Sequence, residues 1–221
     1  MLVSHRYQFI VFPDPLGACP WISRALEPWL DQPIVGSRNA TTQSNFFRDM
    51  SPAEAELAFD VAGFAFRKYT RIAIVRHPAQ KMVQLYDRIA KTNKIWRMRR
   101  SVGVGDPGFT RWLASTRPNG YGAAPFGGPR WRRFGAWSGE AWCGDYVSHV
   151  VRAENAEEEL TEVFHGLGIS PGFSGHALDA LTLMQPTQSR YNAEARTILR
   201  NRYAWDLNLY GHEAKNLQLV A

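Results

Sequence analysis

The sequence has few cysteines and no long apolar run, and each scarcity excludes a class of protein. Its 221 residues include only two cysteines, Cys19 and Cys143, which can form neither a disulfide framework nor a four-cysteine zinc site. The six histidines form no HExxH motif and no cluster with cysteine, so no metal is expected. No apolar run reaches the roughly 18 residues of a membrane helix, so no membrane span is expected. The absence of a GxxxxGK[ST] motif disfavours an ordinary nucleotide triphosphatase.

Composition and the N-terminal residues indicate a globular protein of the cytoplasm. Apolar residues are 45% and charged residues 21% of the chain, which excludes global disorder. His5 and Arg6 interrupt the first apolar stretch, which therefore makes a poor signal peptide. The length allows a full hydrophobic core and no linker divides the chain, so a single domain over residues 1–221 is expected.

Lysine is also scarce, although the formal net charge is +6. Lysine and arginine together number 26, and only five of these residues are lysines, the first of them Lys68. A GC-rich genome would explain so much arginine. A second explanation is functional, because the planar guanidinium group matches phosphate and sulfate oxygens two at a time. Composition alone leaves both explanations open.

Short apolar runs alternate with helical patterns along the chain. Strands are predicted at residues 7–12, 71–76 and 146–151. Helices are predicted to begin at six places: near Pro20, after the Ser51–Glu54 capping box, after His77-Pro78, near Phe109, after Asn155 and near Ala193. The second helix is expected to end near Lys68, and the last to run to Asp206. Strands separated by helices predict an α/β fold, a three-layer parallel sheet flanked by helices.

The faces that two of these helices bury can also be predicted. Apolar residues at helical spacing define each face. For the helix that follows the capping box, the predicted face consists of Ala58, Val61, Ala62 and Ala65. For the helix that follows His77-Pro78, it consists of Met82, Leu85, Tyr86 and Ile89.

Two segments are expected at the carboxyl ends of the strands, where open α/β sheets bind ligands. The first is loop 13–20, whose strand–loop–helix layout is typical of a phosphate cradle. The second is Arg76, which ends an apolar strand and is predicted to bind an anion. The alternative for Arg76 is an internal ion pair with an acid such as Asp60 or Glu154.

Two further motifs are interpreted as structural. Cys19 beside a helix start could be an activated thiolate, but a C-x5-R phosphatase loop needs an arginine where Ala25 stands, and a small buried thiol is favoured. Residues 103–108 match GxGxxG formally. The apolar strand that a dinucleotide site needs does not precede them, so they are interpreted as a flexible loop.

Segment 94–133 is strongly basic and rich in glycine and proline. It holds nine lysines and arginines against a single acid, Asp106. We expect a mobile, loop-like segment that lines one side of a ligand-binding cleft. Within it, an anionic ligand would be bound by Arg130, Arg132 and Arg133. A solvated basic face is the alternative.

A nucleic-acid surface is a third hypothesis for this segment. Its tryptophans, Trp96, Trp112 and Trp131, could stack on bases between the basic side chains. The sequence contains no recognised nucleic-acid module, so this hypothesis ranks last.

Three stretches resemble a known family, the sulfotransferases, in their carbohydrate-sulfotransferase-like branch. Residues 69–86 (YTRIAIVRHPAQKMVQLY) resemble the family's second phosphate-binding segment. Residues 150–160 (VVRAENAEEEL) are similar to its strand and E-N-L helix start, and residues 201–211 (NRYAWDLNLYG) to its closing Y-x-x-D-x-x-x-F-G-Y. Residues 7–30 stand in the position of its first phosphate-binding loop. The resemblance thus covers nearly the whole chain in the same order.

The resemblance implies a P-loop NTPase-like fold and 3′-phosphoadenosine-5′-phosphosulfate as the sulfuryl donor. The acceptor would be a hydroxyl or amine, with an anionic carbohydrate as the candidate substrate. Arg76 would bind the donor's 3′-phosphate, and Gln84 stands where the family has a serine that assists it. The residues in the place of the loop that wraps the 5′-phosphate are Leu16, Gly17, Ala18, Cys19, Pro20 and Trp21.

The first loop departs from the family pattern. That loop normally reads Pro-Lys-x-Gly-x-Thr-Ser, and its lysine stabilises charge on the bridging oxygen, whereas no lysine precedes Lys68 here. A catalytically degenerate protein that binds a nucleotide or an anionic glycan is therefore the alternative function. The candidates for the acceptor's base are His77, which also stands where it can cap a helix, and His176.

Overall fold

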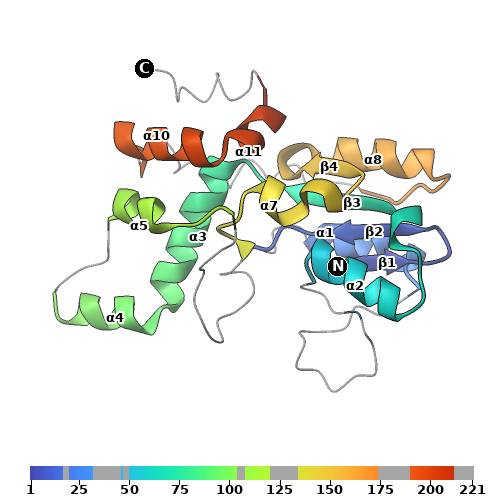
Figure 1. The fold of residues 1–221 in the computed structure, drawn as a ribbon, viewed down its shortest axis with the longest axis horizontal. Helices are drawn as coiled ribbons and strands as arrows, with labels where there is room; N and C mark the ends of the chain where they lie inside the picture. The colour runs from blue at the N-terminus through green and yellow to red at the C-terminus, as the bar shows by residue number, and fades with distance from the viewer. Residues whose placement is uncertain are drawn as a thin grey trace. The chain divides into compact units, whose positions relative to one another are not determined.

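The protein is an α/β protein with a four-stranded mixed sheet flanked by helices (Figure 1). The computed structural model describes residues 1–16, 20–31, 46, 50–103, 108–119, 134–173 and 190–211. Two compact units divide the chain. We call Met1–Arg76 with Trp142–Ala180 the sheet unit, and His77–Ala141 with Leu181–Ala221 the helical unit.

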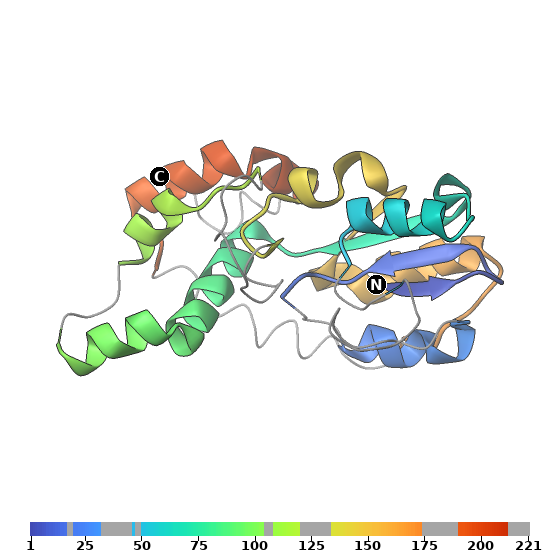
Figure 2. The same cartoon turned by 60° about the horizontal axis from the view of Figure 1, so that its bottom comes forward.

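The sheet contains the three predicted strands and one more. In sheet order the strands are β1 (Leu2–Ser4), β2 (Phe9–Phe12), β3 (Thr70–Val75) and β4 (His149–Arg152). The pairs β2–β3 and β3–β4 are parallel, as predicted. The expectation of an entirely parallel sheet is wrong, because β1 pairs with β2 antiparallel in the blue hairpin of Figure 2. Only four residues join β1 to β2, and a parallel pair needs a crossover of about a dozen.

Helices and apolar side chains complete the sheet unit. Its α-helices and 3-10 helices are α1 (Pro20–Leu26), η1 (Glu27–Trp29), α2 (Pro52–Val61), η2 (Phe66–Lys68), η3 (Gly144–Tyr146), η4 (Ala153–Asn155) and α8 (Ala156–Gly166). Every residue of β2 is buried, as is usual for a strand with parallel neighbours and covered faces. The core joins strands and helices through Phe9, Val11, Ile22, Leu26, Ile72, Ile74, Val151, Leu160 and Phe164.

Helix α2 begins as predicted but buries a different face. The Glu54 amide donates to the Ser51 hydroxyl at 3.4 Å, and the Ser51 amide donates to the Glu54 carboxylate at 2.9 Å. The helix ends at Val61, not near Lys68. Its buried residues are Pro52, Ala55 and Phe59, and Val61 is 81% exposed. The large ring of Phe59, which contacts the rings of Phe46, Phe64, Phe66 and Tyr69, determines which side of the helix faces inward.

The helical unit contains α3 (Pro78–Thr92), α4 (Lys94–Ser101), α5 (Phe109–Ser115), α10 (Ala193–Arg202) and α11 (Ala204–Leu209). The boundary between the two units falls within α7 (Gly139–Cys143). The predicted inner face of α3 is confirmed, because all four of its residues are buried. The predicted final helix is interrupted at Tyr203, which separates α10 from α11. Within the described residues, no helix has the length and apolar character to cross a membrane.

The start of the basic segment is helical, which corrects the expectation of a loop. Residues 94–101 form α4. The Asn93 side chain accepts from the amides of Ile95 at 2.9 Å and Trp96 at 3.3 Å, so it caps the helix start. Between Asn93 and Gly103 no glycine or proline interrupts the helix.

Candidate functional site

The candidate site lies in the sheet unit, at the carboxyl ends of two neighbouring parallel strands. Phe12, the last residue of β2, pairs with Ala73 of β3. The loop that begins at Pro13 and the residue that follows β3, Arg76, therefore leave the sheet at the same edge. This edge is where open α/β sheets bind their ligands.

A buried ion pair joins these two segments. Nη2 of Arg76 lies 3.0 Å from Oδ2 of Asp14, and the two side chains are 3% and 2% exposed. The other carboxylate oxygen of Asp14 accepts a hydrogen bond from the amide of Leu16 at 2.8 Å. Asp14 therefore ties its own loop to the end of β3. The acid in this ion pair is Asp14, which was not among the partners named from the sequence.

The pair determines what chemistry the site can perform. A charge removed from water needs a partner, and Asp14 supplies one for Arg76. An anion that binds this guanidinium group has to replace the carboxylate or bind beside it, against its repulsion. The arrangement thus ties loop 13–16 to the end of β3 and holds a cation at the carboxyl edge of the strands.

The other predicted loop residues are described in part. Leu16 is half-buried, and Pro20 is the exposed first residue of α1, where its missing amide is tolerated. Trp21 packs edge-on against Phe173, with ring centroids 5.8 Å apart, so its ring has a structural contact. Three loop residues lie outside the described residues: Gly17, Ala18 and Cys19.

His77 is the N-cap of α3. Its Nδ1 accepts a hydrogen bond from the amide of Ala79 at 3.2 Å, and its ring packs edge-on against Tyr210. The side chain is buried, and burial lowers the pKa of His77 to about 4. An Nδ1 that accepts from a backbone amide carries no proton, so the neutral ring holds its proton on Nε2. This tautomer and this pKa suit a helix cap and make His77 a weak base.

Of the remaining sequence candidates, the structure describes Gln84 alone. Gln84 is half-buried in the middle of α3. His176 lies outside the described residues, as do Arg130, Arg132 and Arg133.

Two of the three tryptophans named for base stacking have ring partners inside the helical unit. Trp112 is only 9% exposed, with its ring 5.3 Å from that of Tyr86. The half-buried ring of Trp96 also lies 5.3 Å from that of Tyr86. Trp131 is outside the described residues. Trp112 thus belongs to an aromatic core and offers no open face for a base.

Sequence reasoning missed a buried polar network in the helical unit. The amide of Gly139 donates to both carboxylate oxygens of Asp206, at 2.9 and 3.0 Å. Burial raises the pKa of Asp206, while the charge of Lys81 and the Gly139 hydrogen bond oppose that shift. Lys81 is itself buried and donates to the carbonyl of Trp137 at 2.6 Å.

Tyr203 extends this network. Its hydroxyl donates to the carbonyl of Ala136 at 2.8 Å, and burial raises its pKa above the usual range. Tyr203 and Asp206 belong to the segment 201–211 that resembles the closing motif of the family. In this structure both hold the backbone of residues 136–139. The signal in the sequence was an acid on the otherwise apolar side of a helix, three residues after a tyrosine.

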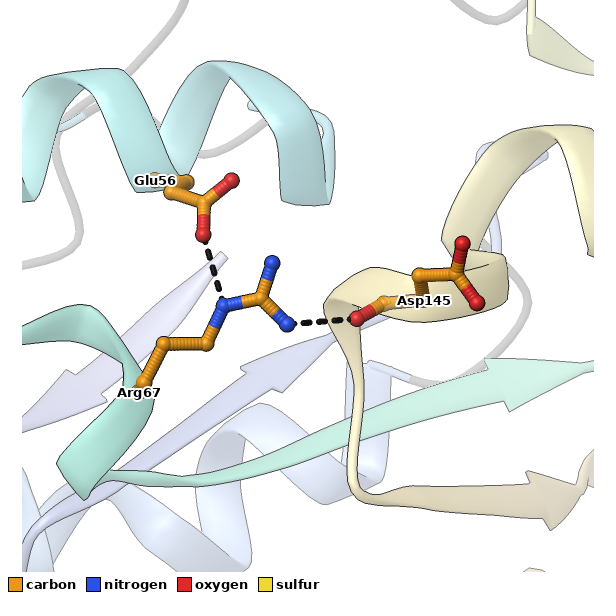
Figure 3. A network of polar contacts seen from close by, with 3 residues as sticks. All are labelled: Glu56, Arg67 and Asp145. Carbon is orange, nitrogen blue, oxygen red and sulfur yellow. Dashed lines mark hydrogen bonds and ion pairs between the residues drawn. The ribbon is translucent and has the colours of Figure 1, made fainter.

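A second polar network lies at the opposite, amino end of β3. Nε of Arg67 donates to Glu56 and Nη1 to the carbonyl of Asp145, both at 2.7 Å (Figure 3). The Arg67 side chain is 56% exposed, and exposed pairs typically contribute only about 0–1 kcal/mol. Burial and the charge of Arg67 lower the pKa of the nearby Arg71. We interpret this network as a link between α2 and η3, away from the carboxyl edge of the strands.

The fold and the site thus define an α/β protein in which a buried arginine and a loop meet at one sheet edge. Comparisons with protein-family models, with curated proteins and with solved structures found no match to this chain.

Proposed function

We propose that the protein is a cytoplasmic sulfotransferase-like enzyme with 3′-phosphoadenosine-5′-phosphosulfate as its donor and a single P-loop NTPase-like domain. The observation that carries the proposal is the meeting of loop 13–16 with Arg76 at the carboxyl edge of β2 and β3. These are the two segments that resemble the family's phosphate-binding segments. Helix α3 then begins at Pro78, directly after the arginine, as the resemblance implies.

In this proposal Arg76 binds the 3′-phosphate of the donor. A guanidinium group pairs with phosphate oxygens in a planar, two-pronged geometry, so a phosphate is a suitable replacement for the Asp14 carboxylate. Displacement of Asp14 would also release the amide of Leu16 from its hydrogen bond. Binding of the 3′-phosphate and opening of the first loop are then one event.

The transfer step forms a bond from the acceptor oxygen or nitrogen to sulfur and breaks the bond from sulfur to the bridging phosphate oxygen. The acceptor proton goes to a base, and 3′-phosphoadenosine-5′-phosphate leaves. His77 is committed to the cap of α3, so we propose His176 as the base. Arg130, Arg132 and Arg133 are proposed to bind an anionic carbohydrate acceptor.

One observation favours a second candidate, a degenerate protein that binds the nucleotide or an anionic glycan without transfer. The only charged side chain of loop 13–16 is an acid, Asp14, and no lysine precedes Lys68. The loss of one charge-stabilising donor typically costs about 3 kcal/mol of transition-state stabilisation, or about a hundredfold in rate.

Calorimetry with 3′-phosphoadenosine-5′-phosphate tests the proposal. We expect micromolar binding to the full chain and much weaker binding of adenosine 5′-phosphate, which lacks the phosphate that Arg76 would hold. A labelled-sulfate transfer assay then separates the enzyme from the degenerate protein. Equal affinity for the two nucleotides, or no binding of either, would show that the proposal is wrong.

A further inference from the structure

Helix α4 and the residue that follows Ser101 expose an apolar stripe. Ile95 is 63% exposed, Met98 62% and Val102 67%. Their spacing of three and four residues places them on one side of the helix. We call these three side chains the α4 stripe.

Cationic side chains border the α4 stripe. With about 100° of rotation per residue, Lys94 lies on one side of the stripe and Arg99 on the other. Both side chains are exposed, as is that of Arg97. From residue 88 to residue 105 the chain contains six lysines and arginines and no acid. The residues on either side of the stripe in the sequence therefore carry only positive charge.

The opposite side of α4 is attached to the helical unit. The half-buried ring of Trp96 packs against Tyr86 of α3, and Asn93 caps the start of α4 (green, Figure 2). The orientation of the helix therefore keeps the stripe in water. Long cationic side chains beside an apolar stripe can extend to a lipid headgroup while the stripe enters the acyl boundary.

We propose that α4 is an interfacial helix that binds the surface of an anionic lipid membrane. The α4 stripe enters the headgroup region, and Lys94, Arg97 and Arg99 contact lipid phosphates and carboxylates. Charge complementarity favours this partner, because an anionic membrane supplies both an apolar layer and negative charge. Nucleic acid would satisfy the cations but leave the stripe in water. The inference is independent of sulfuryl transfer.

Sedimentation of the full chain with vesicles tests the inference. We expect binding to vesicles of phosphatidylcholine with phosphatidylserine and little binding to phosphatidylcholine alone. The triple variant Ile95→Ser/Met98→Ser/Val102→Ser should bind at least about tenfold more weakly, since three apolar side chains no longer leave water. In a second variant, Lys94→Gln/Arg99→Gln, each lost cation should weaken binding by about fivefold.

A matched control comes from α2. Leu57 and Val61 are 67% and 81% exposed, as much as the α4 stripe, but acids stand beside them at Glu56 and Asp60. The variant Leu57→Ser/Val61→Ser should therefore bind the anionic vesicles as the unchanged protein does. All the substituted side chains are exposed, so the melting temperatures should stay the same.

Three outcomes would overturn the proposal. The unchanged protein could fail to bind the anionic vesicles, the triple-serine variant could bind them equally well, or the α2 control could lose binding to the same extent. Binding of single-stranded RNA without vesicle binding would also overturn it and would assign the basic surface to nucleic acid.

Discussion

Substitution at the Asp14–Arg76 pair separates the contribution of the pair to folding from its contribution to anion binding. Both side chains are almost fully buried and their charged atoms lie 3.0 Å apart. Removal of one partner of a buried pair leaves the other charge uncompensated and typically costs about 3–5 kcal/mol. Since folded domains are stable by only about 5–15 kcal/mol, the effect should be large.

A double-mutant cycle measures this effect. We expect Asp14→Asn and Arg76→Met each to lower the free energy of unfolding by about 3–5 kcal/mol in urea denaturation. The double variant should lose less than the sum of the two, because each single substitution already removes the attraction between the two charges. If the free energy of unfolding depends equally steeply on urea concentration in all of them, the variants unfold in the same way as the unchanged protein.

The same variants test whether Arg76 binds the nucleotide. If the 3′-phosphate replaces the carboxylate, Asp14→Asn should bind 3′-phosphoadenosine-5′-phosphate at least about tenfold more tightly, since like charges in contact repel by several kcal/mol. Arg76→Met should abolish that binding. Two results would refute the reasoning: losses below about 1 kcal/mol in both single variants, as for an exposed pair, or unchanged nucleotide affinity in Arg76→Met.

Three other outcomes follow from the structure. Burial depresses the pKa of His77 from 6.5 to about 4. Between these two pH values the unfolded chain binds a proton at this residue and the folded protein does not. The free energy of unfolding should therefore fall by about 3 kcal/mol as the pH drops from 6.5 to 4. His77→Asn, which keeps a cap acceptor, should remove this slope in acid titrations of stability, and the exposed control His165→Gln should keep it. A Cβ at Gly139 would clash with the ring of Trp205, so Gly139→Ala should destabilise the protein by about 1–3 kcal/mol in the same urea assay, and a neutral effect would contradict the packing. A variant in which glutamine replaces Arg130, Arg132 and Arg133 together should bind sulfated oligosaccharides more weakly at low salt. Its affinity for the nucleotide should be unchanged.

Local chemistry explains which predictions about single elements are confirmed. Ser51 and Glu54 are three residues apart and satisfy each other's backbone amides, so the start of α2 is visible in a four-residue window. The inner face of α3 follows from its spacing alone, because a helix with one apolar side buries that side. By contrast, the buried face of α2 depends on rings from distant parts of the chain that pack around Phe59.

The sequence by itself determined three parallel strands and the helix starts at Pro20, Pro52 and Pro78, because apolar runs, caps and prolines act within a few residues. It also indicated that loop 13–20 and Arg76 share a sheet edge. Only the tertiary structure decided that Asp14 neutralises Arg76 and that Asp206 holds Gly139. These partners stand more than sixty residues apart in the chain. A charge needs a partner once it is buried, and only folding buries it and brings a distant partner within reach.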